Sequence, residues 1–481
     1  MHSRLSEGER YDTWRRARLG QLKVIIGPRS ALFAPLPNVG FIAVDECHDG
    51  SYYQSEPPFY SAVGAAMAYA RLCGAVCVLG SATPTIQQRY QASSRAGTEG
   101  WESLRLLELP KRIQISEFSA NLGGLPPVSI IDMREELKSG NRGVFSRALV
   151  EALNEVLKKG QQAILFLNRR GTATYVFCRE CGHVLKCPKC DTPLTLHIDM
   201  LVQEHGKPAN VLICHRCGYT RQIPEKCPVC GSDQIRQYGL GSEKVEAEVG
   251  ALFPSARTLR WDWETTRQKD SHEIILSHFT AHRADVLIGT QMLAKGLDLP
   301  LVTLVGIVLA EVGLNLPDPF AAERTFGLLT QVSGRAGRSA LGGWVVLQTF
   351  QPEHYVIQAA AGHDYAAFYA RELDYRRQLG YPPFNRLVRM EYRHVQAIKA
   401  VSEAQGLAAE LAKWIESEDR RETTLIGPAP CFFSRLNGLY RWQIILRGPN
   451  PASLLREKNF EGAALGAAKG WRVEVDPVTL L

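Results

Sequence analysis

The sequence predicts an α/β protein built on parallel sheets, with a cysteine-rich insertion in its second sheet domain and a small C-terminal domain. Three observations lead to this prediction. Short apolar runs that end in polar or glycine residues recur along the chain, with helical segments between them. Eight of the twelve cysteines lie between residues 178 and 230. The region after about residue 352 has the order strand, helix, strand, strand, helix, strand.

Composition places the chain among ordinary globular proteins. It has 481 residues, of which 45% are hydrophobic and 22% charged, enough for about three domains. The net charge of +7 permits a nucleic-acid partner without identifying one. We see no secretory signal and no apolar run long enough to cross a membrane, so we expect a cytoplasmic protein without a membrane partner.

The N-terminal region predicts a parallel, doubly wound sheet. Apolar runs at Lys23–Gly27, Gly40–Val44 and Ala75–Leu79 have the pattern of strands. The alanine-rich segment Val63–Leu72 has the pattern of a helix between the last two. Ligands of such sheets lie beyond the carboxyl ends of the strands, so functional residues are expected directly after the second and third runs.

An acidic pair, Asp45 and Glu46, follows the second run, and Ser81–Thr83 follows the third. One carboxylate can hold Mg²⁺ while the other orients an attacking water, as a nucleoside triphosphate site requires. Acidic pairs are also common in solvated loops, so this interpretation depends on the residues around the pair.

Four aromatic residues lie in the loop Asp49–Tyr60, which also contains glycine and proline. Exposed aromatic rings on a flexible loop can stack on nucleic-acid bases. Packing of the same rings against the neighbouring helix is an equal alternative. The four residues are Tyr52, Tyr53, Phe59 and Tyr60.

A second α/β region opens after a linker-like stretch from residue 91 to about 127. Ser146 is the expected N-cap of a helix whose apolar residues share one face. We expect strands at 128–132, 163–167, 285–288 and 344–349, an apolar stretch at 301–310, and helices at 146–158, 242–252 and 320–329.

The cysteine-rich stretch interrupts this region after the run at 163–167. Each Cys-x-x-Cys turn lets two thiolates converge on one ion, and tetrahedral Zn²⁺ takes four sulfurs, so four pairs predict two closed zinc sites. The alternatives are a disulfide framework, which the expected reducing compartment disfavours, and a chance cluster of buried thiols. The ligands are Cys178, Cys181, Cys187, Cys190, Cys214, Cys217, Cys227 and Cys230.

A glutamine and two arginines form a further pattern at Gln331–Arg338. We expect a glycine-broken turn at a helix here, with Arg335 and Arg338 three residues apart. A guanidinium in this position can donate to a γ-phosphate, as an arginine finger does. The Gln331–Arg338 pattern and the Asp-Glu-x-His pattern at Asp45–His48 together predict one nucleotide site in a cleft between two sheets.

The C-terminal region is expected to be a small domain with the ferredoxin-like split pattern. Its expected strands are 386–392, 424–429, 440–447 and 471–475, and its expected helices are 396–417 and 451–469. The expected domain boundaries are 1–118, 119–176 with 232–351, 177–231 for the zinc insertion, and 352–481.

These motifs together resemble those of the superfamily 2 helicases. Gly80–Pro84 is similar to motif III, Gly289–Gly296 to motif V and Gln331–Arg338 to motif VI. Within that superfamily, Phe166–Gly171 followed by eight cysteines, and Tyr381–Phe384, resemble the PriA family of primosomal replication-restart helicases. The resemblance runs over the whole chain.

The resemblance implies two RecA-like lobes, the first incomplete here, with the zinc insertion in the second. It implies an ATP-dependent 3′→5′ DNA helicase that acts in replication restart and primosome assembly at stalled forks. The implied cofactors are two Zn²⁺, ATP and Mg²⁺. The implied partners are forked and single-stranded DNA, primosome proteins and single-stranded-DNA-binding protein. In that family the first and last cysteine pairs share one zinc, and the two middle pairs share the other.

The functional positions of the family carry over residue by residue. The implied catalytic residues are Asp45, Glu46, His48, Gln331, Arg335 and Arg338. The residues implied to bind ATP and Mg²⁺ are Asp45, Glu46, Gly296, Arg335 and Arg338. The residues implied to bind DNA are Thr290, Gln291 and the loop aromatics Tyr52, Tyr53, Phe59 and Tyr60. In the family this loop couples DNA binding to ATP hydrolysis.

Two departures from the family pattern bear on activity. Cys47 stands where the family usually has a second glutamate. The phosphate-binding pattern Gly-x-x-x-x-Gly-Lys-Ser/Thr does not occur, and Gly206–Lys207 is followed by proline. We therefore expect the C-terminal portion of such a helicase, without the upstream DNA-binding region, and its own ATPase activity is uncertain. The alternative is a catalytically inactive zinc-bearing module that binds DNA or primosome proteins.

Overall fold

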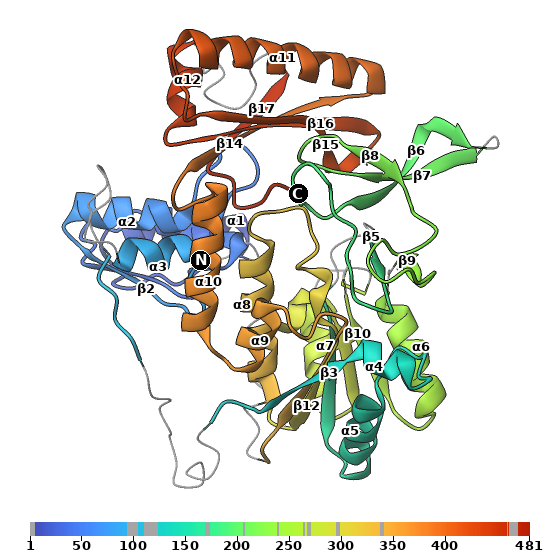
Figure 1. Ribbon diagram of the computed structural model, residues 1–481. Helices are drawn as coiled ribbons and strands as arrows, with labels where there is room; N and C mark the ends of the chain where they lie inside the picture. Colours follow the sequence, from blue (N-terminus) through green and yellow to red (C-terminus); the bar gives the residue numbers. More distant parts are fainter. Residues whose placement is uncertain are drawn as a thin grey trace. The chain divides into compact units, whose positions relative to one another are not determined.

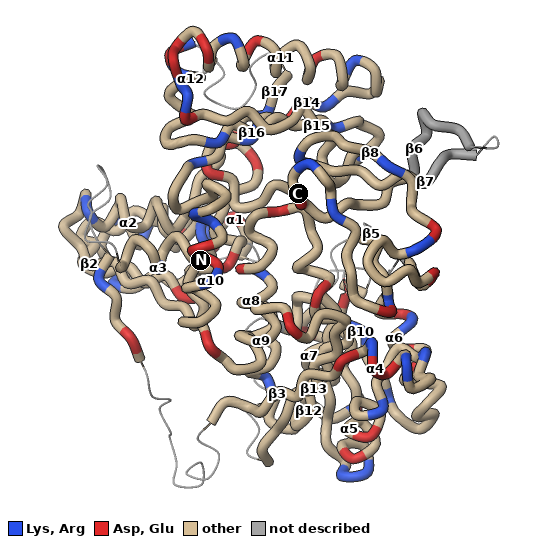
Figure 2. The backbone as a smooth tube through the Cα atoms, in the orientation of Figure 1, with Lys and Arg blue, Asp and Glu red and all other residues tan. Residues whose placement is uncertain are grey.

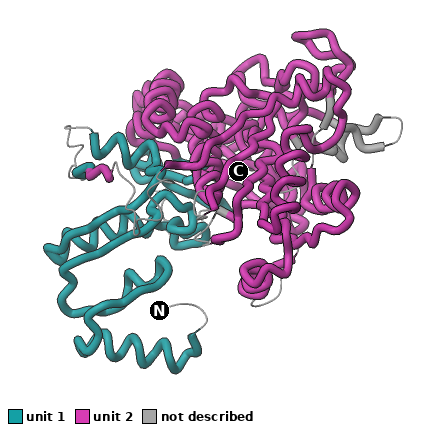
Figure 3. Tube along the Cα trace, turned by 90° about the horizontal axis from the view of Figure 1, so that it is seen from below, with its two compact units in different colours: residues 1–106, 388–390, 451–478 teal, residues 107–387, 391–450, 479–481 magenta. Residues whose placement is uncertain are grey.

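The structure is a computed structural model, and its described residues fall into two compact units (Figure 3). The first unit comprises residues 1–106, 388–390 and 451–478, and the second comprises 107–387, 391–450 and 479–481. No described helix has the length and apolarity needed to cross a lipid bilayer. The described residues are 5–93, 104–109, 124–168, 174–204, 207–237, 240–262, 265–266, 271–294, 299–336, 341–458, 460 and 470–481.

A parallel strand pair forms the sheet of the first unit. Strands β1 (Phe41–Val44) and β2 (Val76–Leu79) are joined through helix α2 (Ala62–Cys73). Ser61 caps the start of α2, and Gly74 ends it with left-handed backbone at φ 63°. The strand ends lie side by side because Val44 pairs with Leu79 in register. This arrangement confirms the strand–helix–strand order that the sequence predicts.

The prediction of a strand at Lys23–Gly27 is wrong. Val24 and Ile26 are 73% and 83% exposed, and the segment belongs to no sheet of the described residues. An apolar run stays irregular when no neighbouring strand takes its backbone hydrogen bonds. The unit also contains α1 (Glu7–Arg18), α3 (Ile86–Ser93) and the short 3₁₀ helices η1 (Arg29–Phe33) and η2 (Gly50–Tyr52).

The second unit is built on a six-stranded parallel sheet with strand order β10-β11-β4-β12-β13-β3. Every residue of β4, β11 and β12 is buried, as expected for parallel strands covered on both faces. The strands are β3 (Val128–Asp132), β4 (Gln162–Leu167), β10 (Thr258–Trp261), β11 (Val286–Gly289), β12 (Val302–Leu309) and β13 (Trp344–Thr349).

Helix α5 (Arg147–Lys158) packs on this sheet through the apolar face that the sequence predicts. Leu149 and Leu153 are fully buried against residues of β4. Ser146 caps the helix, since its hydroxyl accepts from the Leu149 amide at 3.2 Å. Its own amide donates to the side chain of Gln348 on β13 at 2.7 Å. The cap therefore also ties the helix to the sheet.

Other helices of the unit differ in part from the prediction. Helix α8 (Ala321–Ala336) runs through Gly334, so the glycine-broken turn expected within Gln331–Arg338 is wrong at Gly334, and Gly337 and Arg338 lie outside the described residues. The glycine costs a long, largely buried helix too little to break it. The sequence also gave no sign of β10 or α7 (Ser271–Thr280). The remaining helices are α4 (Met133–Lys138), α6 (Ser242–Leu252), η4 (Gln291–Ala294) and η5 (Ala310–Val312).

The cysteine-rich insertion follows β4 and forms its own five-stranded sheet, with order β8-β7-β6-β5-β9 (Figure 1). Its entry strand β5 pairs antiparallel with its exit strand β9, and Cys178 lies opposite Ile235. The two ends of the insertion are thus held side by side. The strands are β5 (Thr174–Cys178), β6 (Thr195–Glu204), β7 (Lys207–Ile213), β8 (Thr220–Gln222) and β9 (Ile235–Gln237).

The C-terminal region has the predicted order of elements. It runs β14 (Arg386–His394), α11 (Ala397–Ser417), β15 (Thr424–Leu436), β16 (Leu439–Gly448), α12 (Pro451–Glu457) and β17 (Trp471–Val475). Strands β15 and β16 form an antiparallel hairpin on which α11 packs. Helix α12 is shorter than expected, and residues 459 and 461–469 of that expectation lie outside the described residues. Two unpredicted helices, α9 (Tyr355–Ala361) and α10 (Tyr365–Leu379), precede β14.

Candidate functional site

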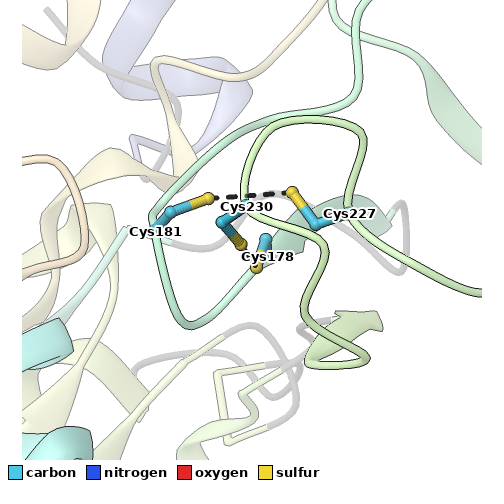
Figure 4. A group of neighbouring side chains, drawn as sticks. All are labelled: Cys178, Cys181, Cys227 and Cys230. Carbon is cyan, nitrogen blue, oxygen red and sulfur yellow. Dashed lines mark hydrogen bonds between the residues drawn. The ribbon is translucent and has the colours of Figure 1, made fainter.

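The eight cysteines of the insertion gather into two groups of four. Figure 4 shows the first group, in which the sulfurs of all four side chains point toward one another. Within each group the sulfurs lie within 4.8 Å of one another. The first group is Cys178, Cys181, Cys227 and Cys230, and the second is Cys187, Cys190, Cys214 and Cys217. The nested pairing expected from the family resemblance is therefore confirmed.

One backbone turn is repeated at all four Cys-x-x-Cys pairs. The residue after the second cysteine has left-handed backbone, with φ between 53° and 75°. Its amide donates to the carbonyl of the first cysteine at 2.8–3.0 Å. Glycine fills three of these positions and aspartate the fourth, both residues that tolerate this conformation. The residues are Gly182, Asp191, Gly218 and Gly231.

The spacing of the sulfurs fits tetrahedral zinc. Zinc–sulfur bonds of about 2.3 Å place the sulfurs at tetrahedral corners about 3.8 Å apart. The Sγ–Sγ distances are 3.6 and 3.7 Å in the first group and 3.4, 3.5 and 3.9 Å in the second. A disulfide would need about 2.05 Å. All eight thiols are free, so the chain contains two Cys₄ sites that could each hold a zinc ion.

Asp45 and Glu46 follow β1 and are exposed at its carboxyl end, as predicted. The Glu46 amide donates to Asp45 Oδ1 at 2.9 Å, and Glu46 itself has left-handed backbone at φ 46°. Such a conformation is unfavourable for a glutamate and is common where function dictates the backbone. Cys47 behaves differently, because its thiol is buried and burial raises its pKa to about 11.

His48 connects this motif to the loop after β2. Its Nδ1 lies 2.7 Å from the Ser81 hydroxyl, which in turn accepts from the Thr83 amide at 3.0 Å. The same nitrogen lies 3.5 Å from a Glu46 carboxylate oxygen. The acidic motif and the Ser-Ala-Thr motif therefore form one hydrogen-bonded group. The sequence pattern predicted no specific role for the side chain of Ser81 in this group.

The four aromatic residues of the loop after the acidic motif differ in exposure. Tyr53 is only 9% exposed, and burial together with the nearby Glu474 carboxylate raises its pKa. The Tyr52 hydroxyl donates to the Asp45 carbonyl at 2.8 Å. The ring of Phe59 lies under the guanidinium of Arg472, 4.8 Å from its centroid. Tyr52, Phe59 and Tyr60 are half-buried, so base stacking by them stays a prediction.

The remaining predicted site residues belong to the second unit. Thr290 and Gln291 follow β11 and are half-buried. Gln331 and Arg335 lie one turn apart on α8, and Arg335 is 5% exposed. Gly296 and Arg338 lie outside the described residues. Because Asp45 lies in the first unit, the cleft shared by these groups stays a prediction.

Two further polar groups of the second unit were not predicted. The Nε2 atoms of His197 and His215 lie 2.8 Å apart, and His215 Nδ1 lies 2.8 Å from the Pro430 carbonyl on β15. Glu311, in η5 and two residues after the end of β12, is fully buried. Its carboxylate accepts from the Thr349 hydroxyl at 2.8 Å and the Phe350 amide at 2.9 Å. These groups depend on tertiary contacts that leave no local pattern in the sequence.

Two protein families match parts of the chain. Residues 263–340 match the helicase conserved C-terminal domain, and residues 377–478 match the primosomal protein N C-terminal domain. The chain is 42% identical over 447 residues to the replication restart protein PriA of Bacillus subtilis, covering 93% of the chain and 52% of the relative. It is 43% identical over 450 residues to that of Synechocystis, with the same coverage of each.

The relative from Treponema pallidum decides the assignment. This replication restart protein PriA is 37% identical over 484 residues, which cover 100% of the chain and 68% of the relative. The chain belongs to the replication restart protein PriA family. It spans about half the length of the Bacillus and Synechocystis relatives. In this PriA family member the helicase C-terminal match includes β11 and β12 of the six-stranded parallel sheet, and the two Cys₄ sites lie in an insertion of the same unit.

Proposed function

We propose that this chain contributes to an ATP-dependent 3′→5′ DNA helicase that acts in replication restart and primosome assembly at stalled forks. The observation that carries the proposal is the alignment with PriA proteins over 93–100% of the chain. The proposed partners are forked and single-stranded DNA, primosome proteins and single-stranded-DNA-binding protein. The proposed location is the reducing cytoplasm, where eight free thiolates can hold metal rather than oxidise.

Each Cys₄ group binds one structural Zn²⁺ in this proposal. Metal binding at such closed sites supplies the folding free energy of the surrounding module. Metal analysis of the purified chain should give two zinc ions per molecule. Replacing Cys217 with serine should reduce this number to one and unfold the part of the insertion around the second Cys₄ group. A stoichiometry clearly below two in the unsubstituted chain would contradict the proposal.

Asp45 and Glu46 are the proposed Mg²⁺ and water-orienting groups, and Arg335 and Arg338 the proposed γ-phosphate contacts. A phosphate-binding loop supplies backbone amides and a lysine around the β- and γ-phosphates. The sequence contains no such loop, so this chain by itself should not hydrolyse ATP at a helicase-like rate. DNA binding should survive in weakened, salt-sensitive form.

The test is an ATPase assay of this chain with and without single-stranded DNA. The matched control is Glu46→Gln, which keeps the shape of the side chain and removes the carboxylate. Turnover stimulated by DNA and lost in Glu46→Gln would refute the expected inactivity. Equal turnover in both proteins would indicate a contaminating ATPase.

The absence of the Gly-x-x-x-x-Gly-Lys-Ser/Thr pattern favours one second candidate function. In that case the chain is a catalytically inactive zinc-bearing module that binds DNA or primosome proteins. Titration with fluorescent ATP separates the two candidates. A helicase portion should bind nucleotide weakly in a way that Arg335→Ala abolishes, whereas an inactive module should show no binding that depends on Arg335.

A further inference from the structure

Charge on this chain is mostly balanced locally. Lys and Arg are interspersed with Asp and Glu along elements such as α11 (Figure 2). The net charge of +7 therefore does not by itself locate a surface for an anionic partner. A place where cations gather without an ion-paired carboxylate is more informative, and the second unit contains one around Tyr381.

Two arginines converge on the ring of Tyr381. Arg216 lies between Cys214 and Cys217 of the second Cys₄ group, and its guanidinium carbon is 5.8 Å from the ring centroid of Tyr381. Arg447 lies on β16, and its guanidinium carbon is 5.3 Å from the same centroid. Tyr381 is 8% exposed, whereas both arginines are half-buried and so partly open to solvent.

Neither guanidinium forms an ion pair within the part of the chain that the structure describes. No described carboxylate lies within ion-pair distance of Arg216 or Arg447, and the one protein acceptor bonded to Arg447 is the Leu379 carbonyl. Burial lowers the pKa of Arg447, and the charge of Arg216 lowers it further. Two half-buried like charges disfavour the folded chain unless an anion joins them.

We propose that Arg216, Arg447 and the Tyr381 hydroxyl form a binding site for a backbone phosphate of single-stranded DNA. The inference rests on the DNA binding proposed above. A phosphodiester offers two anionic oxygens, which match the planar donor forks of guanidinium groups. Arg216 belongs to the insertion, Tyr381 to the segment before β14, and Arg447 to β16. One phosphate bound by all three would therefore bridge the insertion and the C-terminal region.

The test is the salt dependence of binding to a fluorescent single-stranded oligonucleotide, measured by anisotropy. Each phosphate contact adds about 0.7 to the slope of log affinity against log salt. Arg216→Gln and Arg447→Gln should each lower the slope by about that amount, and Arg447→Lys should restore most of it. Arg421→Gln is the matched control, because Arg421 is exposed and pairs with Asp419. Zinc content should be checked in the Arg216 variant.

The outcomes separate this inference from the proposed function. Slopes unchanged in both glutamine variants, or lowered equally in Arg421→Gln, would overturn the site while DNA binding itself stands. No DNA binding by the unsubstituted chain would overturn the proposed function and the site together. A site for free phosphate would let inorganic phosphate displace the oligonucleotide far better than chloride at equal ionic strength, and that result would also overturn the assignment to DNA.

Discussion

Glu311 should give the chain a distinctive dependence of stability on pH. Its carboxylate is fully buried at the end of β12, and burial raises its pKa to about 7, with a further contribution from Asp132. In the unfolded chain the pKa is near the ordinary value of 4.5. The folded state therefore holds the proton more tightly than the unfolded state. The resulting stabilisation is present below pH 4.5 and is lost as the pH rises through about 7.

The size of this effect follows from the shift. A pKa difference of about 2.5 units corresponds to about 3 kcal/mol between the two protonation states. Most of that change falls between pH 5 and pH 8, so the free energy of unfolding should drop by about 2–3 kcal/mol from this residue across that range. Glu311→Gln mimics the protonated side chain and should remove this contribution.

The assay is urea unfolding followed by circular dichroism at pH 5 and pH 8. The two proteins share all other titrating groups, so the difference between their pH dependences isolates Glu311. Glu151→Gln, an exposed position on α5, controls for the substitution itself. If Glu311→Gln and the unsubstituted chain lose the same free energy between pH 5 and pH 8, the reasoning is refuted.

Three substitutions and one control substitution test the packing of the second unit. Gly182→Ala should destabilise the first Cys₄ site by more than about 2 kcal/mol, because φ at Gly182 is 75° and the new Cβ would meet the Phe350 carbonyl oxygen. Asp191→Gly, at the equivalent position of another Cys-x-x-Cys turn, is the control and should change stability little. Thermal melting measures both effects. Leu149→Ala should cost about 2–5 kcal/mol in urea unfolding, since the side chain is fully buried. Ser146→Ala should cost about 1–2 kcal/mol, and a loss below about 0.3 kcal/mol would mean that the cap is dispensable.

Elements with strong local signals were predicted well. β4 is a continuous apolar run, and Ser146 stands directly before an amphipathic helix, so both were found within a residue of their bounds. The run at Lys23–Gly27 has the same apolar character but no neighbouring strand among the described residues, and strand formation depends on such a neighbour. Gly334 suggested a turn, yet packing of α8 outweighs the low helix propensity of one glycine.

The parts of the candidate site that could be predicted are those whose functional side chains lie in one short sequence pattern. The four Cys-x-x-Cys pairs predicted two metal sites, and the family resemblance gave their nesting. The contact of Arg216 with Tyr381 and Arg447 could not be predicted, because it joins residues far apart in the chain whose local surroundings are ordinary. The meeting of Asp45 with Arg335 is still a prediction from the motifs.

The antiparallel pairing of β5 with β9 has a consequence for how the chain folds. Strand β4 pairs with β11 although the whole insertion lies between them in the chain. If the insertion closes first, its paired ends act as a short bridge, and the loop that remains between β4 and β11 is roughly half as long. The entropy cost of bringing β4 beside β11 then falls by about 0.6 kcal/mol, the value for halving a loop. Metal supply would in that way influence the rate at which the parallel sheet forms, and refolding with a zinc chelator should slow the sheet by up to about threefold as well as the insertion.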